Sequence, residues 1–127
     1  MQGQRLFEYA ILRIMPRVER EEFCNVGVVL YSREAKFLQC RYHLDPVRLK
    51  ALFRELDLHE VEAYLQSFEL ICRGAKNGGP IAQLDLASRF RWLTATRSTI
   101  LQCSKVHPGF CAVPDKALEK LVEQLVL

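Results

Sequence analysis

The sequence lacks any hydrophobic run long enough to cross a membrane. Its longest uninterrupted apolar stretch, residues 26–31, is far shorter than the roughly 20 residues that a transmembrane helix needs. The first residues carry neither the apolar segment nor the small-residue cleavage site of a signal peptide. We therefore expect a protein without membrane association, located in the cytoplasm.

Motifs of the common catalytic and nucleotide-binding sites are also missing. There is no Gly-x-Ser-x-Gly elbow and no cysteine-protease signature. Gly78-Gly79 has neither the spacing nor the preceding strand of a phosphate-binding loop. These absences favour a non-enzymatic protein, and no motif indicates a cofactor.

Cysteine patterns typical of metal sites and disulfide frameworks are absent as well. The five cysteines form no Cys-x-x-Cys pair, which is typical of reduced thiols in core positions. Cys103, His107 and Cys111 carry zinc-competent groups, but Pro108-Gly109 would break a helix between them and a fourth ligand is missing. We expect no metal here, but two packed thiols around a turn at His107-Pro108-Gly109.

Neither sign of charge dominates the composition. Eighteen Lys and Arg residues against 15 Asp and Glu leave a net charge of +3, which is weak for a dedicated nucleic-acid-binding protein. The chain has 127 residues, of which 50% are hydrophobic and 26% charged. This balance excludes a disordered, collagen-like or coiled-coil protein and predicts one globular domain over residues 1–127.

The first third of the chain has the pattern of three strands. Residues 6–15 are rich in β-favouring side chains and stop at Pro16, and the uncharged, valine-rich segment 23–31 indicates a central strand. A short loop then leads into the alternating segment 36–44. We expect an antiparallel meander.

Helices follow this meander. Asp45-Pro46 begins the first, and Asp57 begins a second whose apolar residues lie three and four apart until Gly74. Further on, the pattern predicts a short helix over 83–93, a strand over 98–104 and a final helix from Pro114. The whole predicts an α+β fold: a mostly antiparallel sheet of about four strands, a three-stranded meander plus a later strand, backed by helices on one face.

The first polar cluster that could bind a ligand spans residues 89–99. It holds three arginines, a tryptophan and four hydroxyl groups, and Arg97, Ser98 and Thr99 form its centre. Arginine forks and hydroxyl groups bind phosphates and acidic side chains. The alternative is a turn whose hydroxyl groups satisfy the backbone and whose arginines pair with nearby glutamates.

A second polar cluster lies between the first two predicted strands. Arg17, Glu21 and Glu22 belong to a run of alternating charges, in which the glutamates could pair with Arg97 or hold a cation. Asn25 interrupts an apolar strand, so its amide needs partners if it is buried. In a purely structural alternative, Arg97 pairs with Glu21 and Asn25 caps the turn, without any ligand.

These two clusters resemble a known family. The strings PRVEREEFCNVGVVLY and RFRWLTATRSTILQCSKVHPGF, together with the closing DKALEKLVEQLV, are similar to the bacterial family called domain of unknown function 3037. The resemblance covers residues 9–126. The positions that match the family pattern are Arg13, Pro16, Arg17, Glu19, Glu21, Phe23, Asn25, Gly27, Trp92, Arg97, Ser98, Thr99, Gln102, His107 and Gly109.

The resemblance implies a partner. Genes of that family often lie beside a gene for a HipA-like kinase, the type found in toxin–antitoxin modules. It therefore implies an accessory or antitoxin-like protein that binds such a kinase or its phosphorylated target.

Two functions are compatible with these residues. The first is a non-enzymatic interaction or regulatory module, as the resemblance implies. The second is a small phosphate- or nucleic-acid-binding domain, with a possible hydrolytic activity, in which Arg17, Arg97, Ser98 and His107 would grip a phosphate and Glu21 or Glu22 would act as base or metal ligand. An exposed apolar strand edge would also support a homodimer.

Overall fold

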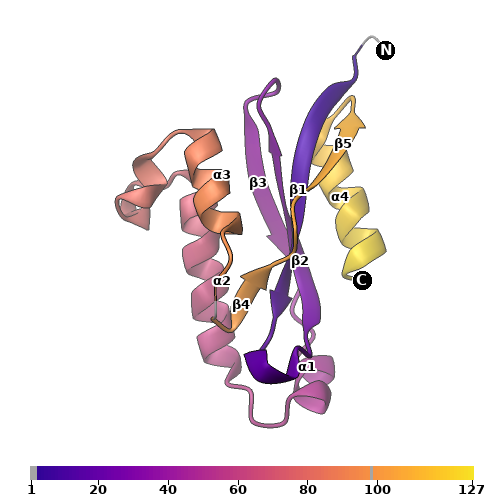
Figure 1. Cartoon of the computed structure of the whole chain (residues 1–127), viewed down its shortest axis with the longest axis vertical. Coiled ribbons are helices and arrows are strands. Elements are labelled where there is room, and N and C mark those ends of the chain that lie inside the picture. The colour runs from indigo at the N-terminus through magenta and orange to yellow at the C-terminus, as the bar shows by residue number, and fades with distance from the viewer. Residues whose placement is uncertain (1–2, 98) are drawn as a thin grey trace.

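The computed structural model describes residues 3–97 and 99–127, which fold into a layered α+β structure (Figure 1). The strands are β1 (Arg5–Ile14), β2 (Cys24–Ser32), β3 (Phe37–Tyr42), β4 (Leu101–Cys103) and β5 (His107–Cys111). The α-helices are α1 (Pro46–Leu52), α2 (Leu58–Arg73), α3 (Leu86–Thr94) and α4 (Pro114–Leu125), and the short 3-10 helices are η1 (Val18–Arg20), η2 (Lys76–Gly78) and η3 (Ile81–Gln83).

The predicted meander is confirmed. β1 pairs antiparallel with β2, and β2 with β3, in the order β3-β2-β1. β2 is therefore an inner strand, as its uncharged sequence predicted. β4 and β5 both lie antiparallel along the other edge of β1, at its two ends.

The predicted fourth strand and the turn after it differ from the structure. The strand over 98–104 is shorter, because only 101–103 form β4. The turn at His107-Pro108-Gly109 is wrong, since these residues begin β5 and pair with β1. Pro108 fits there because β5 is an edge strand and needs no hydrogen bonds on its outer side.

Helices cover both faces of the sheet rather than one. α2 and α3 lie on one side and α4 on the other (Figure 1). Leu65 of α2 and Leu93 of α3 belong to a core with Leu12, whereas Leu118 of α4 belongs to a second core with Val28. Successive residues of β1 and β2 point to opposite faces of the sheet, and both sets are largely apolar. Each face of the sheet therefore has to be covered by helices.

The helix boundaries follow their caps. The side chains of Asp45, Asp57 and Asp85 accept hydrogen bonds from the first backbone N–H groups of α1, α2 and α3. Gly74 ends α2 in the left-handed conformation, with φ 67°. The predicted helix over 83–93 is divided, because Asp85 starts α3 only after the 3-10 turn η3. None of the helices in the described ranges combines the length and apolar character needed to cross a bilayer.

A β-bulge in β2 decides where Asn25 points. Leu12 of β1 pairs with Gly27 and Arg13 with Asn25, so Val26 has no partner on β1. Val26 then packs into the core under α2, and Asn25 is turned to the opposite face, beside Arg13. Without this extra residue, the strict alternation of β2 would place Asn25 in the apolar core.

Candidate functional site

Arg97 donates hydrogen bonds to the C-terminal end of helix α3. Its Nη1 donates a hydrogen bond to the carbonyl oxygen of Leu93 at 3.1 Å, and its Nη2 donates to the carbonyl oxygen of Trp92. The guanidinium carbon also lies 4.1 Å from the centre of the Trp92 ring. These bonds satisfy carbonyl groups that a helix end leaves unpaired, so Arg97 fixes both the helix end and the tryptophan.

A groove opens beside this pair, between α2, α3 and β4. Its volume is about 230 Å³. Tyr64 and Trp92 are 38% and 40% exposed and stand among mostly apolar lining residues. The lining consists of Tyr64, Ser67, Phe68, Ile71, Trp92, Leu93, Ala95, Arg97, Thr99, Leu101, Gln102 and Cys103. We call it the Trp92 groove.

Two polar side chains of the Trp92 groove, Thr99 and Cys103, are bound to the backbone. Thr99 Oγ1 donates a hydrogen bond to the carbonyl oxygen of Leu101 at 2.7 Å. The Cys103 thiol donates to the carbonyl oxygen of Leu93 at 3.4 Å, and burial raises its pKa to about 12. Cys103 therefore stays protonated near neutral pH and is a poor nucleophile. Ser98 lies outside the described residues.

The second predicted cluster forms local ion pairs on an exposed loop. Arg17 Nε lies 2.7 Å from a carboxylate oxygen of Glu19, and Arg20 pairs with Glu22. The hydrogen bond from Arg20 lowers the pKa of Glu22. Glu21 is exposed and has the left-handed φ of 55° at the end of η1.

This loop forms one wall of a wide polar cavity. The cavity has a volume of about 780 Å³, and its other wall is the connection between α1 and α2. Arg17 and Glu22 line it together with charged residues of both signs, including Arg54 and Asp57. The mixed charges give it no clear preference for an anion or a cation.

The structural alternative that joined the two clusters is wrong in its contacts. The ion pairs of the described residues do not include one between Arg97 and Glu21. Arg97 donates instead to the end of α3. Asn25 does not cap the turn, because its Nδ2 donates to the carbonyl oxygen of Leu125 at the end of α4, at 3.2 Å.

His107 lies apart from both clusters. It pairs with Tyr9 across β1 and β5, and the two rings lie 5.3 Å apart. Cys111 packs with the core under α4, whereas Cys103 packs with the core under α2 and α3. The three residues that were considered as zinc ligands therefore do not face one another.

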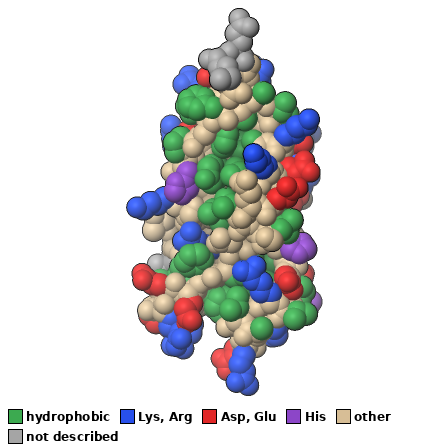
Figure 2. Space-filling model, turned by 90° about the vertical axis from the view of Figure 1, so that its right-hand side faces the viewer, with side chains coloured by type: hydrophobic (Ala, Val, Ile, Leu, Met, Phe, Trp, Pro, Cys, Tyr) green, Lys and Arg blue, Asp and Glu red, His purple; other side chains and the backbone are tan. Residues whose placement is uncertain are grey.

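A further polar group lies on the face of the sheet that α4 covers in part. Arg13, on β1, pairs directly with Asn25 on β2 and with Gln102 on β4. Its guanidinium carbon lies 3.9 Å from the centre of the Phe23 ring. We call these four residues the Arg13 cluster. Figure 2 shows the α4 side, where hydrophobic side chains gather in the upper middle of the face and charged side chains lie around and below them.

Of the Arg13 cluster, only Asn25 was among the predicted site residues. Residues 13, 25 and 102 are far apart in the chain and become neighbours only through strand pairing. The available signal was a polar residue between two apolar neighbours at each of these three positions. All four residues are also among the positions that match the family pattern.

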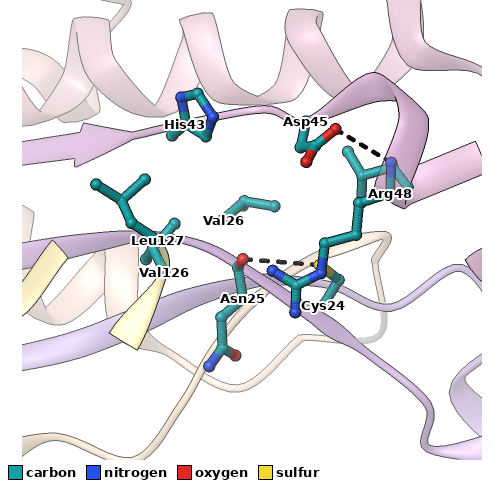
Figure 3. A pocket seen from close by; sticks show the side chains of 9 residues that line it. Cys24, Asn25, Val26, His43, Asp45, Arg48, Val126 and Leu127 are labelled. Carbon is teal, nitrogen blue, oxygen red and sulfur yellow. Dashed lines mark hydrogen bonds between the residues drawn. The ribbon is translucent and has the colours of Figure 1, made fainter. Parts of the chain in front are cut away.

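A separate cavity of about 290 Å³ lies beside the backbone of Asn25 (Figure 3). His43, Asp45 and Arg48 provide its polar side chains, while the Asn25 side chain points away from it. Asp45 also accepts a hydrogen bond from the backbone N–H of Arg48 at 3.1 Å, which is its role as the cap of α1.

The comparison with known proteins agrees with the resemblance of the two motifs. Searches of curated proteins and of solved structures give no match. Residues 9–126, almost the entire chain, match the family described as protein of unknown function (DUF3037). The chain therefore belongs to the family of domain of unknown function 3037.

Proposed function

We propose that this protein is a non-enzymatic interaction module that binds a protein partner through the Trp92 groove. The observation that carries the proposal is the half-exposed Trp92 ring, held by Arg97 at the edge of an apolar groove. Trp, Tyr and Arg are the residues most enriched among those that dominate binding energy at protein interfaces. The Trp92 groove presents one of each.

The rigidity of Trp92 supports the same proposal. Its backbone lies in α3, and Arg97 covers one side of its ring. A pre-positioned ring loses little conformational freedom on binding, which leaves more of the contact energy as affinity. An apolar side chain of a partner would also remove Tyr64 and Trp92 from water.

For the partner, we propose a HipA-like kinase in the cytoplasm. The support is the gene neighbourhood that family membership implies, and the five free cysteines suit a reducing compartment. The competing proposal, a phosphate- or nucleic-acid-binding domain, has weaker support. The guanidinium donors of Arg97 already serve carbonyl oxygens, and Arg17 is paired with Glu19.

The test is a binding measurement with a HipA-like kinase encoded beside the gene for this chain. We expect a stable complex for the unchanged protein and affinity about thirtyfold lower for Trp92→Ala, since removing such an anchor costs roughly 2 kcal/mol or more. Leu84→Ala is the matched control, because Leu84 is 44% exposed near the start of α3 but does not line the groove.

Two results would contradict the proposal. One is the absence of any complex with the kinase, and the other is an unchanged affinity for Trp92→Ala. Circular dichroism establishes that both variants are folded. Sedimentation of the protein alone separately tests a homodimer.

A further inference from the structure

Arg13 is a half-buried cation without a counter-ion in the described part of the chain. The ion pairs of that part involve Arg17, Arg20, Arg41 and Arg73, but not Arg13. Its Nε–H is buried and has no hydrogen-bond partner there. A buried N–H without a partner costs free energy, and more so when the group is charged.

The strands on both sides of Arg13 add polar groups but no negative charge. Asn25 Oδ1 is buried without a hydrogen-bond partner, and Asn25 Nδ2 is bound to the end of α4. Gln102 Nε2 donates to the carbonyl oxygen of Thr99 at 3.0 Å. Phe23, 42% exposed, stacks on the guanidinium and shields one side of it from water. This partial shielding strengthens the attraction for an external anion.

The Arg13 cluster and the Trp92 groove lie on opposite faces of the sheet and meet at the edge strand β4. Gln102 belongs to both, because it pairs with Arg13 and also lines the groove. β4 is an edge strand of only three residues, so a partner segment that crosses its outer edge from one face to the other can reach both places. Both Arg97, of the groove, and Arg13 lie close enough to Cys103 for their charges to lower its pKa, although the larger effect of burial raises it.

We infer that Arg13 is the anion-binding residue of the docking surface, and that the partner segment carries an Asp or Glu next to its apolar anchor. The anchor lies in the Trp92 groove and the carboxylate pairs with Arg13. This inference rests on the proposed function. A carboxylate fits better than a phosphate, because the site offers a single free guanidinium fork, whereas the donors of Arg97 are engaged.

The experiment is a selection of random 12-residue peptides displayed on phage against the immobilised full chain. It is run in parallel on the unchanged protein, Trp92→Ala, Arg13→Gln and Arg17→Gln. Arg17 is the matched control, because it is exposed and paired with Glu19. We expect peptides with an apolar residue near an Asp or Glu, loss of the acidic preference only with Arg13→Gln, and loss of apolar selection with Trp92→Ala.

A double-mutant cycle then isolates the contact. The best peptide, its acid-to-amide version and its phosphoserine version are titrated against the unchanged protein and Arg13→Gln. The amide should bind about tenfold more weakly to the unchanged protein, and no more weakly than the acid to Arg13→Gln. Thermal melting checks folding, and if Arg13→Gln does not fold, Arg13→Lys replaces it, with a reduced acid preference expected.

The outcomes separate the two proposals. Peptides that depend on Trp92 but have no acidic preference coupled to Arg13 would overturn the inference and leave the interaction module standing. Much tighter binding of the phosphoserine version would overturn the assignment to a carboxylate. A failure to enrich any peptide that depends on Trp92 would overturn both proposals.

Discussion

Three arginines of the family motifs have three different environments. Arg17 forms an exposed ion pair with Glu19, and such pairs contribute at most about 1 kcal/mol. Arg97 caps a helix end and stacks on Trp92. Arg13 pairs with the uncharged Asn25 and Gln102, and none of the ion pairs among residues 3–97 and 99–127 includes it. Of the three, Arg13 is therefore the best placed to bind an anion from outside the chain.

Gly27 is a residue whose identity the close approach of strand β3 requires. A Cβ atom there would lie 2.6 Å from the carbonyl oxygen of Arg41 and 2.8 Å from the Cβ of Tyr42. Backbone atoms of the paired strand β3 cannot give way cheaply, so we expect Gly27→Ala to lower the free energy of unfolding by about 1–3 kcal/mol. Urea unfolding followed by circular dichroism measures this change.

Gly79→Ala is the comparison for the Gly27 prediction, because its cost comes from backbone conformation alone and not from a steric clash. A Cβ at Gly79 meets no atom within 4 Å, although its φ of 86° is unfavourable for alanine. With ψ −174°, this is a conformation that almost only glycine adopts, and it alone costs another residue roughly 1–3 kcal/mol. A Gly27→Ala protein as stable as the unchanged one would show that β2 and β3 are not so closely paired at this position.

At the scale of elements, helix α2 depends on its first cap. Asp57 Oδ1 accepts hydrogen bonds from the backbone N–H groups of His59 at 3.0 Å and Glu60 at 3.4 Å. Asp57→Ala should therefore lower the free energy of unfolding by about 1 kcal/mol. Gln66→Ala, at an exposed position inside the same helix, should change it by less than about 0.5 kcal/mol. Equal effects of the two substitutions in urea unfolding would argue against the cap.

Elements with local signals were predicted well. The meander follows from apolar composition and short loops, and the starts of α1 and α2 follow from aspartate caps. The division between β4 and β5 was missed, because it depends on how this segment pairs with the distant β1. The position of α4 was also missed, since an amphipathic helix does not reveal which face of a sheet it covers.

The candidate site was predicted less completely than the fold, for the same physical reason. Trp92 and Arg97 are five residues apart and meet at the end of one helix, so a sequence motif can reveal them. Arg13 and Gln102 come from strands on which neighbouring positions are apolar and at least partly buried. Their importance depends on strand register, which a single sequence specifies only through the complete pairing.

At the scale of the whole molecule, the two cores share the central strands β1 and β2. Leu65 belongs to the core under α2 and α3, Leu118 belongs to the core under α4, and both are fully buried. Because each core supports the same sheet, loss of either should destabilise both. A single domain of this kind should therefore unfold in one cooperative transition.

Leu65→Ala and Leu118→Ala should each lower the free energy of unfolding by about 2–5 kcal/mol, because each leaves a cavity in a packed core. Val47→Ala is the control. Val47 is 81% exposed, so its substitution should lower the free energy of unfolding by less than about 0.5 kcal/mol.

The cooperativity of the two cores is tested in urea with two probes. Trp92 fluorescence follows the α3 side of the sheet, and hydrogen exchange in peptides from α4 follows the opposite side. If the two cores unfold together, Trp92 fluorescence and α4 hydrogen exchange should change at the same urea concentration in every variant. Early exchange of α4 in Leu118→Ala, with unchanged Trp92 fluorescence, would mean that the two faces of the sheet fold independently.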